Sequence, residues 1–520
     1  MRHGEAKHPV RSSYLVHHFI SHAAQERPDY PFLVHEGRTT PYGEIEAASN
    51  RLARALLSNG LARGDRVALS ARNSRFYVEC YYAILKAGGI AVPLNAGDDG
   101  AALARSLRSC EARMLIAGSR VEQAANDAIA AGTSLELLAL QTGEAIPAGL
   151  SGVRVIACDD VCAAESAEPP LSPPLTDLDV ASIIFTSGST GTPLGATLSH
   201  LNIVSNTRSI VEYLGLTAAD RMLAVLPFHY VYGKSLLNTH AAAGGTVVIE
   251  NRFLYPNTAL DSLENEACTG LAGVPSTFAI LVNRSNLAER ELPQLRYVTQ
   301  AGGPMSPELT RRLMEAIPGK RVIVMYGATE ASARLSYLDP DELPRKIGSI
   351  GKAIPNVELR VLREDGTEAE VGEVGEIVAR GSNLMSGYWG DPEATAEVLD
   401  EHGYHTGDLA RRDEEGFFYI AGRKRDFIKA GAHRISALEI EHAIAELPEI
   451  HEVAVIGVPD EILGEKIKAF VVFREGFEAD PLALEKTLKK KLAHKAPTEI
   501  EVREDLPKSS AGKIMKQALR

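Results

Sequence analysis

The sequence predicts an α/β fold: a large N-terminal domain of two doubly wound α/β subdomains plus a small β-barrel subdomain, then a C-terminal α+β lid domain. Apolar strands alternate with amphipathic helices over residues 42–94 and again from 180 to 325, which indicates parallel sheets covered by helices. Short strands between Gly-Glu and Asp-Gly turns follow at 348–419. The length of 520 residues fits roughly three domains of ~150 residues each.

The first α/β unit follows from its periodicity. Residues 46–59 carry apolar side chains at helical spacing, and Gly60 is suited to end that helix. A strand is expected at 66–69, a helix at 76–87 and a strand at 90–93. This order predicts a βαβ unit with parallel strands.

The second α/β unit begins after residues 141–177, which are rich in Ala, Pro and Ser and predict a surface connection. Its expected strands are 180–185, 247–249, 271–274, 297–298 and 322–325. The last hundred residues predict the separate lid, with a helix at 437–446, strands at 453–458 and 467–473, and a helix at 481–493.

Composition excludes several classes of protein. Hydrophobic residues make up 45% and charged residues 24%, as in globular proteins, and the net charge of −13 argues against binding nucleic acid or an anionic membrane. Five scattered cysteines match neither a disulfide framework nor a zinc ribbon, so we expect a reducing, cytoplasmic compartment. Because no signal-like segment or long apolar run is seen, we expect no transmembrane segment.

The strongest chemical signal is the loop Phe-Thr-Ser-Gly-Ser-Thr-Gly-Thr-Pro at residues 185–193, directly after an apolar strand. Glycines and small hydroxyl residues in this position let backbone N–H groups and hydroxyls surround phosphate oxygens. The loop lacks the Gly-Lys-Ser/Thr ending of a Walker A motif, because Leu194 and Gly195 follow Pro193. Taken alone, such a loop is more often a plain turn than a phosphate site, so its interpretation depends on the motifs that accompany it.

Further motifs follow this loop in a fixed order. They are Leu-Pro-Phe-His-Tyr-Val-Tyr-Gly at 226–233, Gly-Gly-Pro at 302–304, Tyr-Gly-Ala-Thr-Glu at 326–330, Tyr-His-Thr-Gly-Asp at 404–408, Gly-Arg-Lys-Arg-Asp at 422–426 and Pro-Lys-Ser-Ser-Ala-Gly-Lys at 507–513. Together they resemble the adenylate-forming (AMP-binding) superfamily of acyl-CoA synthetases, over residues 40–519.

The resemblance implies a nucleotide site with defined parts. Glu330 would hold Mg²⁺, since a carboxylate suits a hard cation. Asp408 and Arg423 would contact the ribose, because a carboxylate accepts hydrogen bonds from both sugar hydroxyls. The implied cofactor-binding residues are Thr186, Ser187, Gly188, Ser189, Thr190, Gly191, Gly302, Gly303, Pro304, Tyr326, Gly327, Thr329, Asp408, Arg423 and Lys429.

The resemblance also implies a mobile lid that carries a catalytic lysine. Lys513 would meet the two anions that react during adenylation, and Thr186 and Glu330 would act beside it. Arg425 stands at the expected hinge, which divides the chain into domains 1–424 and 425–520. A surface cation in a basic tail remains the alternative for Lys513, and a simple surface arginine the alternative for Arg425.

The acyl pocket is expected around His229, Tyr230, Tyr232, Gly302 and Arg334, with Lys234 a weaker candidate. A cation at position 334 suits a substrate with a polar or second carboxyl group. The alternative is an arginine that points outward or pairs with Asp339 or Asp341.

Two other departures from the family pattern concern catalysis. Leu194 stands where the phosphate loop usually has lysine, so clamping of the β- and γ-phosphates is expected to be weaker. Ala432 stands beside the expected pantetheine channel, where relatives usually have glycine.

The implied activity is ATP-dependent activation of a small-molecule carboxylic acid of unspecified length to acyl-AMP, followed by thioester formation with coenzyme A, with Mg²⁺ screening the phosphates. One alternative is a stand-alone adenylation enzyme that loads a phosphopantetheinyl carrier protein in trans, since no carrier-like segment follows Lys513. Another is a nucleotide-binding protein with catalysis weakened by Leu194.

Overall fold

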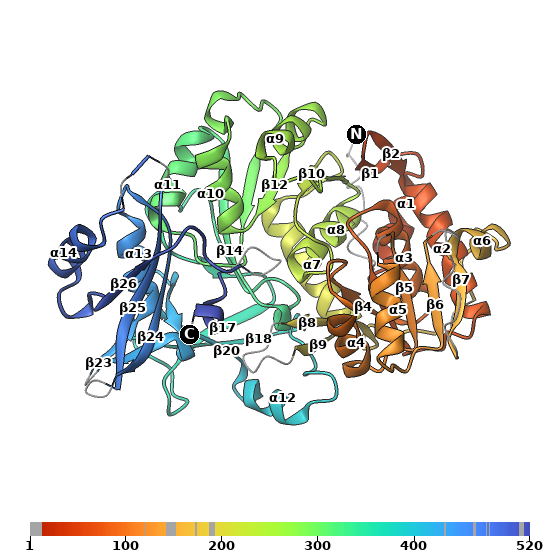
Figure 1. Cartoon of the computed structure of the whole chain (residues 1–520). Coiled ribbons are helices and arrows are strands. Elements are labelled where there is room, and N and C mark those ends of the chain that lie inside the picture. The colour runs from red at the N-terminus through yellow and green to blue at the C-terminus, as the bar shows by residue number, and fades with distance from the viewer. Residues whose placement is uncertain are drawn as a thin grey trace.

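The computed structural model describes residues 13–119, 121–141, 152–171, 174–186, 193–430, 433–460, 464–474, 476–477, 479–508 and 514–519. It confirms the predicted α/β fold (Figure 1). Two large sheets form the body of the protein, a smaller antiparallel sheet lies beside them, and the C-terminal residues form a separate unit at one side. We refer to that unit, from β22 onward, as the lid.

The first large sheet has seven strands among the described residues, all parallel except β9. In spatial order these are β7 (Arg154–Ala157), β6 (Leu137–Leu140), β5 (Met114–Ala117), β3 (Arg66–Ser70), β4 (Ile90–Leu94), β8 (Val180–Thr186) and β9 (Leu194–Ser199). Successive side chains of a strand point to opposite faces. Val67 and Leu69 accordingly join one core, and Ala68 joins another.

The second large sheet has nine strands in the described part of the chain. In spatial order these are β16 (Lys352–Ala353), β15 (Ser336–Leu338), β14 (Arg321–Tyr326), β13 (Tyr297–Gln300), β12 (Gly270–Gly273), β10 (Arg221–Ala224), β11 (Thr246–Ile249), β1 (Pro31–His35) and β2 (Arg38–Pro41). The strands from β14 to β1 are parallel, which places their carboxyl ends along one edge.

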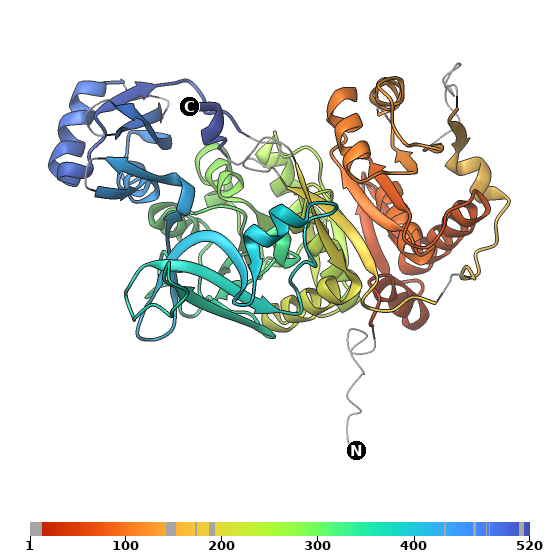
Figure 2. The same cartoon turned by 90° about the horizontal axis from the view of Figure 1, so that it is seen from below.

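Helices cover both large sheets in layers (Figures 1 and 2). The shared middle layer contains α1 (His18–Glu26), α2 (Tyr42–Ser58), α3 (Arg75–Lys86), α7 (His200–Leu214) and α8 (Val231–Ala243). The outer faces carry α4 (Gly100–Ser109) and α5 (Glu122–Ala130) on the first sheet, and α9 (Pro256–Asn265), α10 (Pro275–Arg284) and α11 (Pro307–Ala316) on the second. The middle layer forms the largest core, because both of its faces are covered.

The third sheet is antiparallel and precedes the lid. It contains β17 (Val357–Leu362), β18 (Gly375–Gly381), β20 (Gly403–Arg412), β19 (Leu399–Asp400) and β21 (Phe418–Arg423), with α12 (Pro392–Val398) at its side. The lid contains β23 (His433–Ser436), β22 (Phe427–Ala430), β25 (Gly464–Phe473), β24 (Ile450–Asp460), β26 (Glu499–Val502), α13 (Ala437–Ala445) and α14 (Pro481–Leu492).

One expectation about the connection at 141–177 is wrong in part. The structure places β7 and α6 (Cys158–Ala163) within this stretch, and β7 pairs in parallel with β6 at the edge of the seven-stranded sheet. A four-residue edge strand is too short to give a periodic signal among Ala, Pro and Ser. Among the described residues, no helix is long and apolar enough to cross a membrane.

Candidate active site

Two glycine-containing motifs lie side by side at the carboxyl edge of the nine-stranded sheet. Gly302 to Pro304 come after β13, and Tyr326 to Thr329 begin at the last residue of β14, the parallel neighbour of β13. Gln300 orients the first motif by donating from Nε2 to the carbonyl of Gly303 at 2.8 Å. Ligands of open α/β sheets bind beyond the carboxyl ends of strands, so these predicted nucleotide residues stand in a suitable place.

Gly327 is required by close packing of the chain. A Cβ atom at this position would lie 2.1 Å from the carbonyl oxygen of Ala333. The backbone N–H of Leu335 also donates to the carbonyl of Tyr326 at 2.9 Å. The turn after β14 therefore folds back on residues 333–335, and a short 3₁₀-helix, η3 (Thr329–Ala331), carries Glu330.

Asp408 is held by two predicted site residues. The Tyr326 hydroxyl donates to Oδ2 at 2.6 Å, and Nε of Arg423 donates to Oδ1 at 3.0 Å. Asp408 in β20 and Arg423 in β21 are cross-strand partners, so strand register brings them together. The buried carboxylate thus keeps lone pairs for two further donors, as a ribose would supply.

The charge of Asp408 affects the pKa values of both residues that hold it, Arg423 and Tyr326. The charge of Asp408 is the largest cause of the raised pKa of the half-exposed Arg423 guanidinium. Burial, followed by the same carboxylate, raises the pKa of the Tyr326 phenol. Tyr326 therefore stays protonated and donates its hydrogen bond to Asp408.

Glu330 is buried and fixed from a segment that sequence reasoning missed. Its Oε1 accepts a hydrogen bond from the Tyr388 hydroxyl at 2.8 Å, and its backbone carbonyl accepts one from Met385 N at 2.7 Å. Tyr388 also forms a β-bridge with Ala196 of β9. Its sequence context, between Gly387 and Trp389, is that of an ordinary turn and gives no chemical signal.

The predicted phosphate loop begins at the end of β8. Thr186 is the cross-strand partner of Leu194, and its hydroxyl donates to the Leu194 carbonyl at 3.3 Å. Leu194 is the first residue of β9 and is partly buried. Ser187, Gly188, Ser189, Thr190 and Gly191 lie outside the described residues.

The first turn of α8 carries Tyr232, one of the residues predicted for the acyl pocket. Its close approach to the preceding loop requires Gly233, where a Cβ atom would meet the carbonyl oxygen of Pro227 at 2.1 Å. Tyr232 donates from its hydroxyl to the carbonyl of Thr299 in β13 at 2.9 Å. The ring of Tyr232 is thereby held between α8 and the sheet.

Arg334 is buried against that ring, with 3% of its surface exposed. The guanidinium carbon lies 4.0 Å from the Tyr232 ring centroid, and the group donates to the Ala333 carbonyl at 2.8 Å and to Sδ of Met325 at 3.3 Å. Among the described residues, no carboxylate lies within 4 Å of it. The outward or paired orientation that the sequence left open does not occur.

Lys234 is a second buried cation on α8. Its Nζ donates to the Tyr77 hydroxyl at 2.8 Å and lies 4.2 Å from the Tyr81 ring centroid, and burial lowers its pKa to about 7. His229 is nearby: burial and the charge of Lys234 lower its pKa to about 4, and its Nε2 has no hydrogen-bond partner among the described residues. Tyr230, the other predicted gating residue, is partly buried and packs against the His229 ring.

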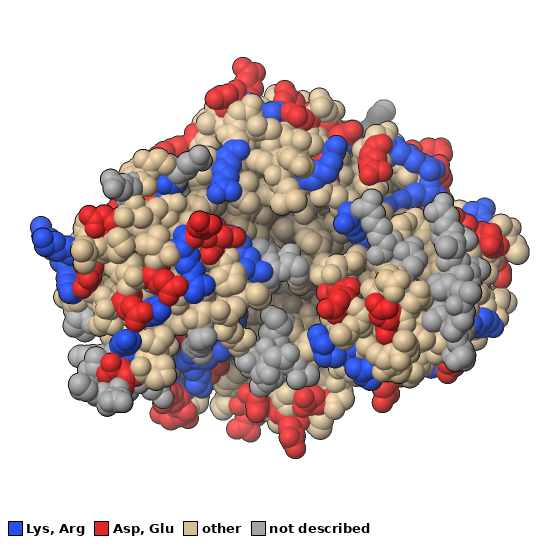
Figure 3. All heavy atoms as spheres, in the orientation of Figure 1, with Lys and Arg blue, Asp and Glu red and all other residues tan. Residues whose placement is uncertain are grey.

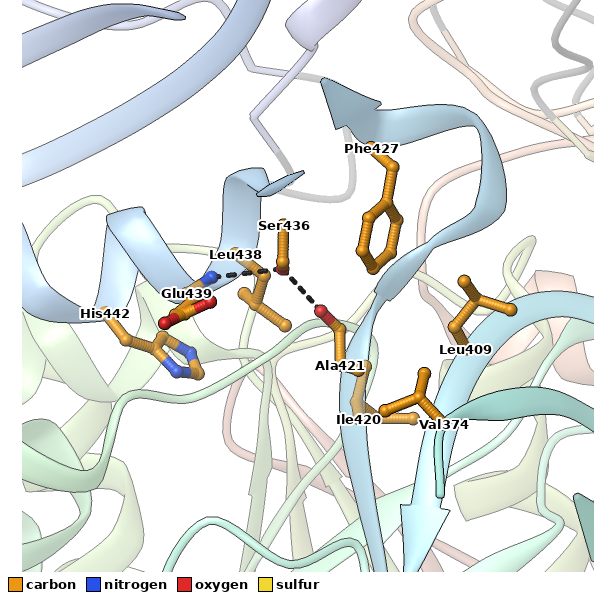
Figure 4. A pocket seen from close by; sticks show the side chains of 9 residues that line it. All are labelled: Val374, Leu409, Ile420, Ala421, Phe427, Ser436, Leu438, Glu439 and His442. Atoms are coloured by element: carbon orange, nitrogen blue, oxygen red, sulfur yellow. Dashed lines mark hydrogen bonds between the residues drawn. The ribbon is translucent and has the colours of Figure 1, made fainter. Parts of the chain in front are cut away.

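Arg425 is the predicted hinge residue between the third sheet and the lid. It lies in η4 (Lys424–Asp426), between β21 and β22. A cavity of about 560 Å³ opens here between β20, β21 and α13 (Figure 4). At its edge the Ser436 hydroxyl donates to the Ala421 carbonyl at 2.5 Å and accepts from Glu439 N at 3.2 Å, which joins the start of α13 to β21.

Three residues predicted for catalysis or thiol access cannot be placed in the same detail. Lys513 and Ala432 lie outside the described residues. Lys429 lies in β22, and its side chain is also outside the described part of the chain. Their roles stay predictions.

The AMP-binding enzyme family matches residues 20–389, and the AMP-binding enzyme C-terminal domain matches residues 439–513. The chain belongs to this family. Feruloyl-CoA synthase of Amycolatopsis sp is 34% identical, with 96% of each chain covered, and the long-chain-fatty-acid–CoA ligase of Bacillus subtilis is 30% identical, with 96% of this chain and 93% of the relative covered. ATP-bound MatB from Rhodopseudomonas palustris superposes with a TM-score of 0.87 at 29% identity, covering 97% of this chain and 98% of MatB.

These comparisons confirm the predicted family and enzyme class, an AMP-forming acid–thiol ligase. They also confirm the fold of a large N-terminal and a small C-terminal domain.

Proposed function

We propose that the chain joins a carboxylic acid to coenzyme A in two half-reactions on one nucleotide site. The observation that carries this proposal is the Tyr326–Asp408–Arg423 group, which lies at the carboxyl edge of the nine-stranded sheet. A buried carboxylate that is already oriented by two donors suits a ribose diol. Family membership assigns the nucleotide as ATP and then AMP.

In the first half-reaction, a carboxylate oxygen of the acid attacks the α-phosphorus of ATP. The new O–P bond forms acyl-AMP as the bond to pyrophosphate breaks. Asp408 and Arg423 hold the ribose, Gly302 to Pro304 and Tyr326 to Thr329 line the adenine and the acyl group, and Thr186 begins the loop around the phosphates. Lys513 stabilises the charge that develops between the two anions.

Glu330 fits the Mg²⁺ that the family uses. One carboxylate oxygen is held by Tyr388, and no hydrogen bond to the other is found among the described residues. Oxygen ligands of this kind suit a hard cation, which would screen the phosphate charges when bound. The hydrogen bond from Tyr388 keeps the carboxylate oriented whether or not the cation is present.

In the second half-reaction, the thiol sulfur of CoA attacks the carbonyl carbon of acyl-AMP. The C–S bond forms, the bond to the AMP oxygen breaks, AMP leaves with the electron pair, and the thiol proton is released to solvent. We propose that the lid turns about Arg425 between the two steps and brings the segment from Lys429 through Ala432 to the thiol channel. The short η4 between two separate sheets supports a pivot there.

The acyl pocket is proposed to lie between His229, Tyr230, Tyr232, Gly302 and Arg334. The relatives act on acids of different kinds, feruloyl and long-chain fatty acyl groups, so the acyl group must be argued from this chain. The buried guanidinium of Arg334 has no carboxylate partner among the described residues, which favours an acid that brings an oxygen acceptor to it.

A carrier-bound phosphopantetheine in trans is the alternative thiol acceptor, because CoA and such a carrier present the same reactive arm.

All five cysteines are free thiols, which supports the expected reducing, cytoplasmic compartment.

ATP–pyrophosphate exchange with a panel of aliphatic, aromatic and dicarboxylic acids tests the proposal. Acid-dependent exchange is expected, and thioester should appear when CoA is added. Acid-dependent exchange, followed by thioester formation only when a carrier protein replaces CoA, would favour the alternative acceptor. ATP binding without exchange would contradict acid activation.

A further inference from the structure

The chain between Glu330 and Arg334 adopts a strained backbone conformation. Ser332 has a φ of 54° and Ala333 a φ of 120°, values that L side chains rarely adopt. Because Glu330 precedes these two residues and Arg334 follows them, the two angles set the direction of Arg334 relative to Glu330. We call residues 330–334 the strained turn. Such a conformation persists only where surrounding contacts hold it.

Two buried asparagines from distant segments hold the strained turn. Asn206 in α7 donates from Nδ2 to the carbonyl oxygen of Arg334 at 2.9 Å. Asn383, which follows β18, donates from Nδ2 to the same oxygen at 2.9 Å and to the Ala331 carbonyl at 3.1 Å. Ala331 and Arg334 flank the two strained residues, so Asn383 spans them. The Oδ1 atoms of both asparagines have no partner among the described residues, so each amide acts here as a donor.

The segments that carry these asparagines also adjoin the nucleotide site. The helix α7 begins directly after β9, the strand that follows the predicted phosphate loop. Asn202 in α7 donates from Nδ2 to the Ser382 carbonyl at 2.8 Å, and Tyr388 holds the carboxylate of Glu330. Hydrogen bonds therefore join α7, residues 382–388 and the strained turn into one unit.

In the view of Figures 1 and 3 this unit lies at a hollow between the lid and the body. Figure 3 shows the surface hollowed where Figure 1 shows α7 and β14, the strand that precedes the strained turn. A rigid unit at this place can present Glu330 and Arg334 to a nucleotide and an acid that enter the hollow.

We propose that Asn206 and Asn383 are positioning residues: they hold the strained turn and thereby fix Glu330 and Arg334 relative to each other. The inference rests on the proposed function, because it takes Glu330 as the Mg²⁺ ligand and Arg334 as the contact to the acid. Loss of either amide leaves the buried Arg334 carbonyl with one donor fewer. Ala333 can then relax to a negative φ, which turns the two site residues away from each other.

Calorimetry and exchange kinetics test the two asparagines. Asn206→Ala and Asn383→Ala should each raise, by roughly tenfold, the Mg²⁺ concentration that half-saturates ATP binding and the KM for the acid that the parent protein activates fastest. Both constants should change more than kcat, because the misplaced groups act in binding. Glycine adopts a φ of 120° without strain, so adding Ala333→Gly to either variant should return both constants toward the parent values.

Asn50→Ala is the matched control. Asn50 in α2 is equally buried and donates from Nδ2 to the Ala167 carbonyl at 2.8 Å, and among the described residues it makes no hydrogen bond to the strained turn. Asn50→Ala should lower the thermal unfolding midpoint, keep the parent constants for Mg²⁺ and acid, and gain nothing from Ala333→Gly.

Several results would overturn the proposal. Unchanged Mg²⁺ and acid constants in Asn206→Ala and Asn383→Ala would do so, as would folded double variants that stay as impaired as the single ones. A similar rise of both constants in Asn50→Ala would mean that any loss of stability has this effect, and would also overturn it.

Urea unfolding without ligand gives a readout that needs no activity. Ala333→Gly should raise the unfolding midpoint of the parent protein more than that of Asn383→Ala, in which the turn has already relaxed. Equal shifts would contradict a turn that the amide holds. A parent protein that activates no acid would contradict the proposed function, while this comparison would still decide whether the amide holds the turn.

Discussion

Lys234 gives a prediction whose size follows from the structure. The ammonium is 2% exposed, and burial lowers its pKa from 10.5 to about 7. Between these values the unfolded chain binds a proton that the folded chain does not, so stability rises with pH across this window. At about 1.4 kcal/mol per pKa unit, the full effect is on the order of 5 kcal/mol.

Lys234→Met removes the titrating group and keeps most of its volume. Between about pH 7 and pH 9, the unfolding free energy of the parent protein should rise by about 2 kcal/mol more than that of the variant. Urea unfolding at several pH values, followed by fluorescence, measures this difference. At neutral pH the variant should be as stable as the parent or more stable, because it carries no buried charge.

Lys86 is the matched control, since it is a buried lysine with a partner. Burial lowers its pKa to about 8, and its Nζ lies 2.6 Å from a carboxylate oxygen of Glu46. Lys86→Met should destabilise the protein at neutral pH, because it leaves Glu46 without that partner. Parallel pH profiles of the unfolding free energy for the parent and Lys234→Met would contradict a pKa lowered by burial and mean that Lys234 is hydrated in solution.

Three further outcomes are expected at the active site. Leu194→Lys should lower the KM for ATP or speed exchange, because a cation at ~4 Å from a phosphate contributes about 1 to 4 kcal/mol; unchanged ATP kinetics would mean that another cation already acts there. Arg334→Leu should shift acid preference toward apolar acids by roughly tenfold, and an unaltered ranking in the exchange panel would place the side chain outside the pocket. Ala432→Trp should keep exchange and lose thioester formation, because an indole would fill the pantetheine channel; equal loss of both steps would contradict that channel.

The sequence predicts the sheet framework well because its signals are local. Apolar strands of four to seven residues that alternate with amphipathic helices predict a parallel sheet. Motifs that come directly after parallel strands must lie at the carboxyl edge of that sheet, which is where the structure has them. The resemblance implied that Asp408 and Arg423 contact the same ribose, and the register of β20 and β21 makes them cross-strand partners.

Contacts between segments that are far apart in the sequence are not indicated by any local sequence pattern. Tyr388 reaches Glu330 from a different part of the chain, and Asn283 meets Arg474 across 191 positions. The burial of Arg334 against Tyr232 depends on how the turn after β14 folds back at Gly327. These features depend on packing in three dimensions, which periodicity and motif spacing do not encode.

We propose that this one chain carries out both half-reactions with different poses of the lid. The most direct measurement compares Lys513→Ala with the parent protein in both steps, after thermal melting has shown that the variant is folded. In Lys513→Ala, ATP–pyrophosphate exchange should be largely lost, while supplied acyl-AMP and CoA should still give thioester at nearly the parent rate. Loss of both steps to the same extent would contradict the two-pose account and indicate a single fixed active site.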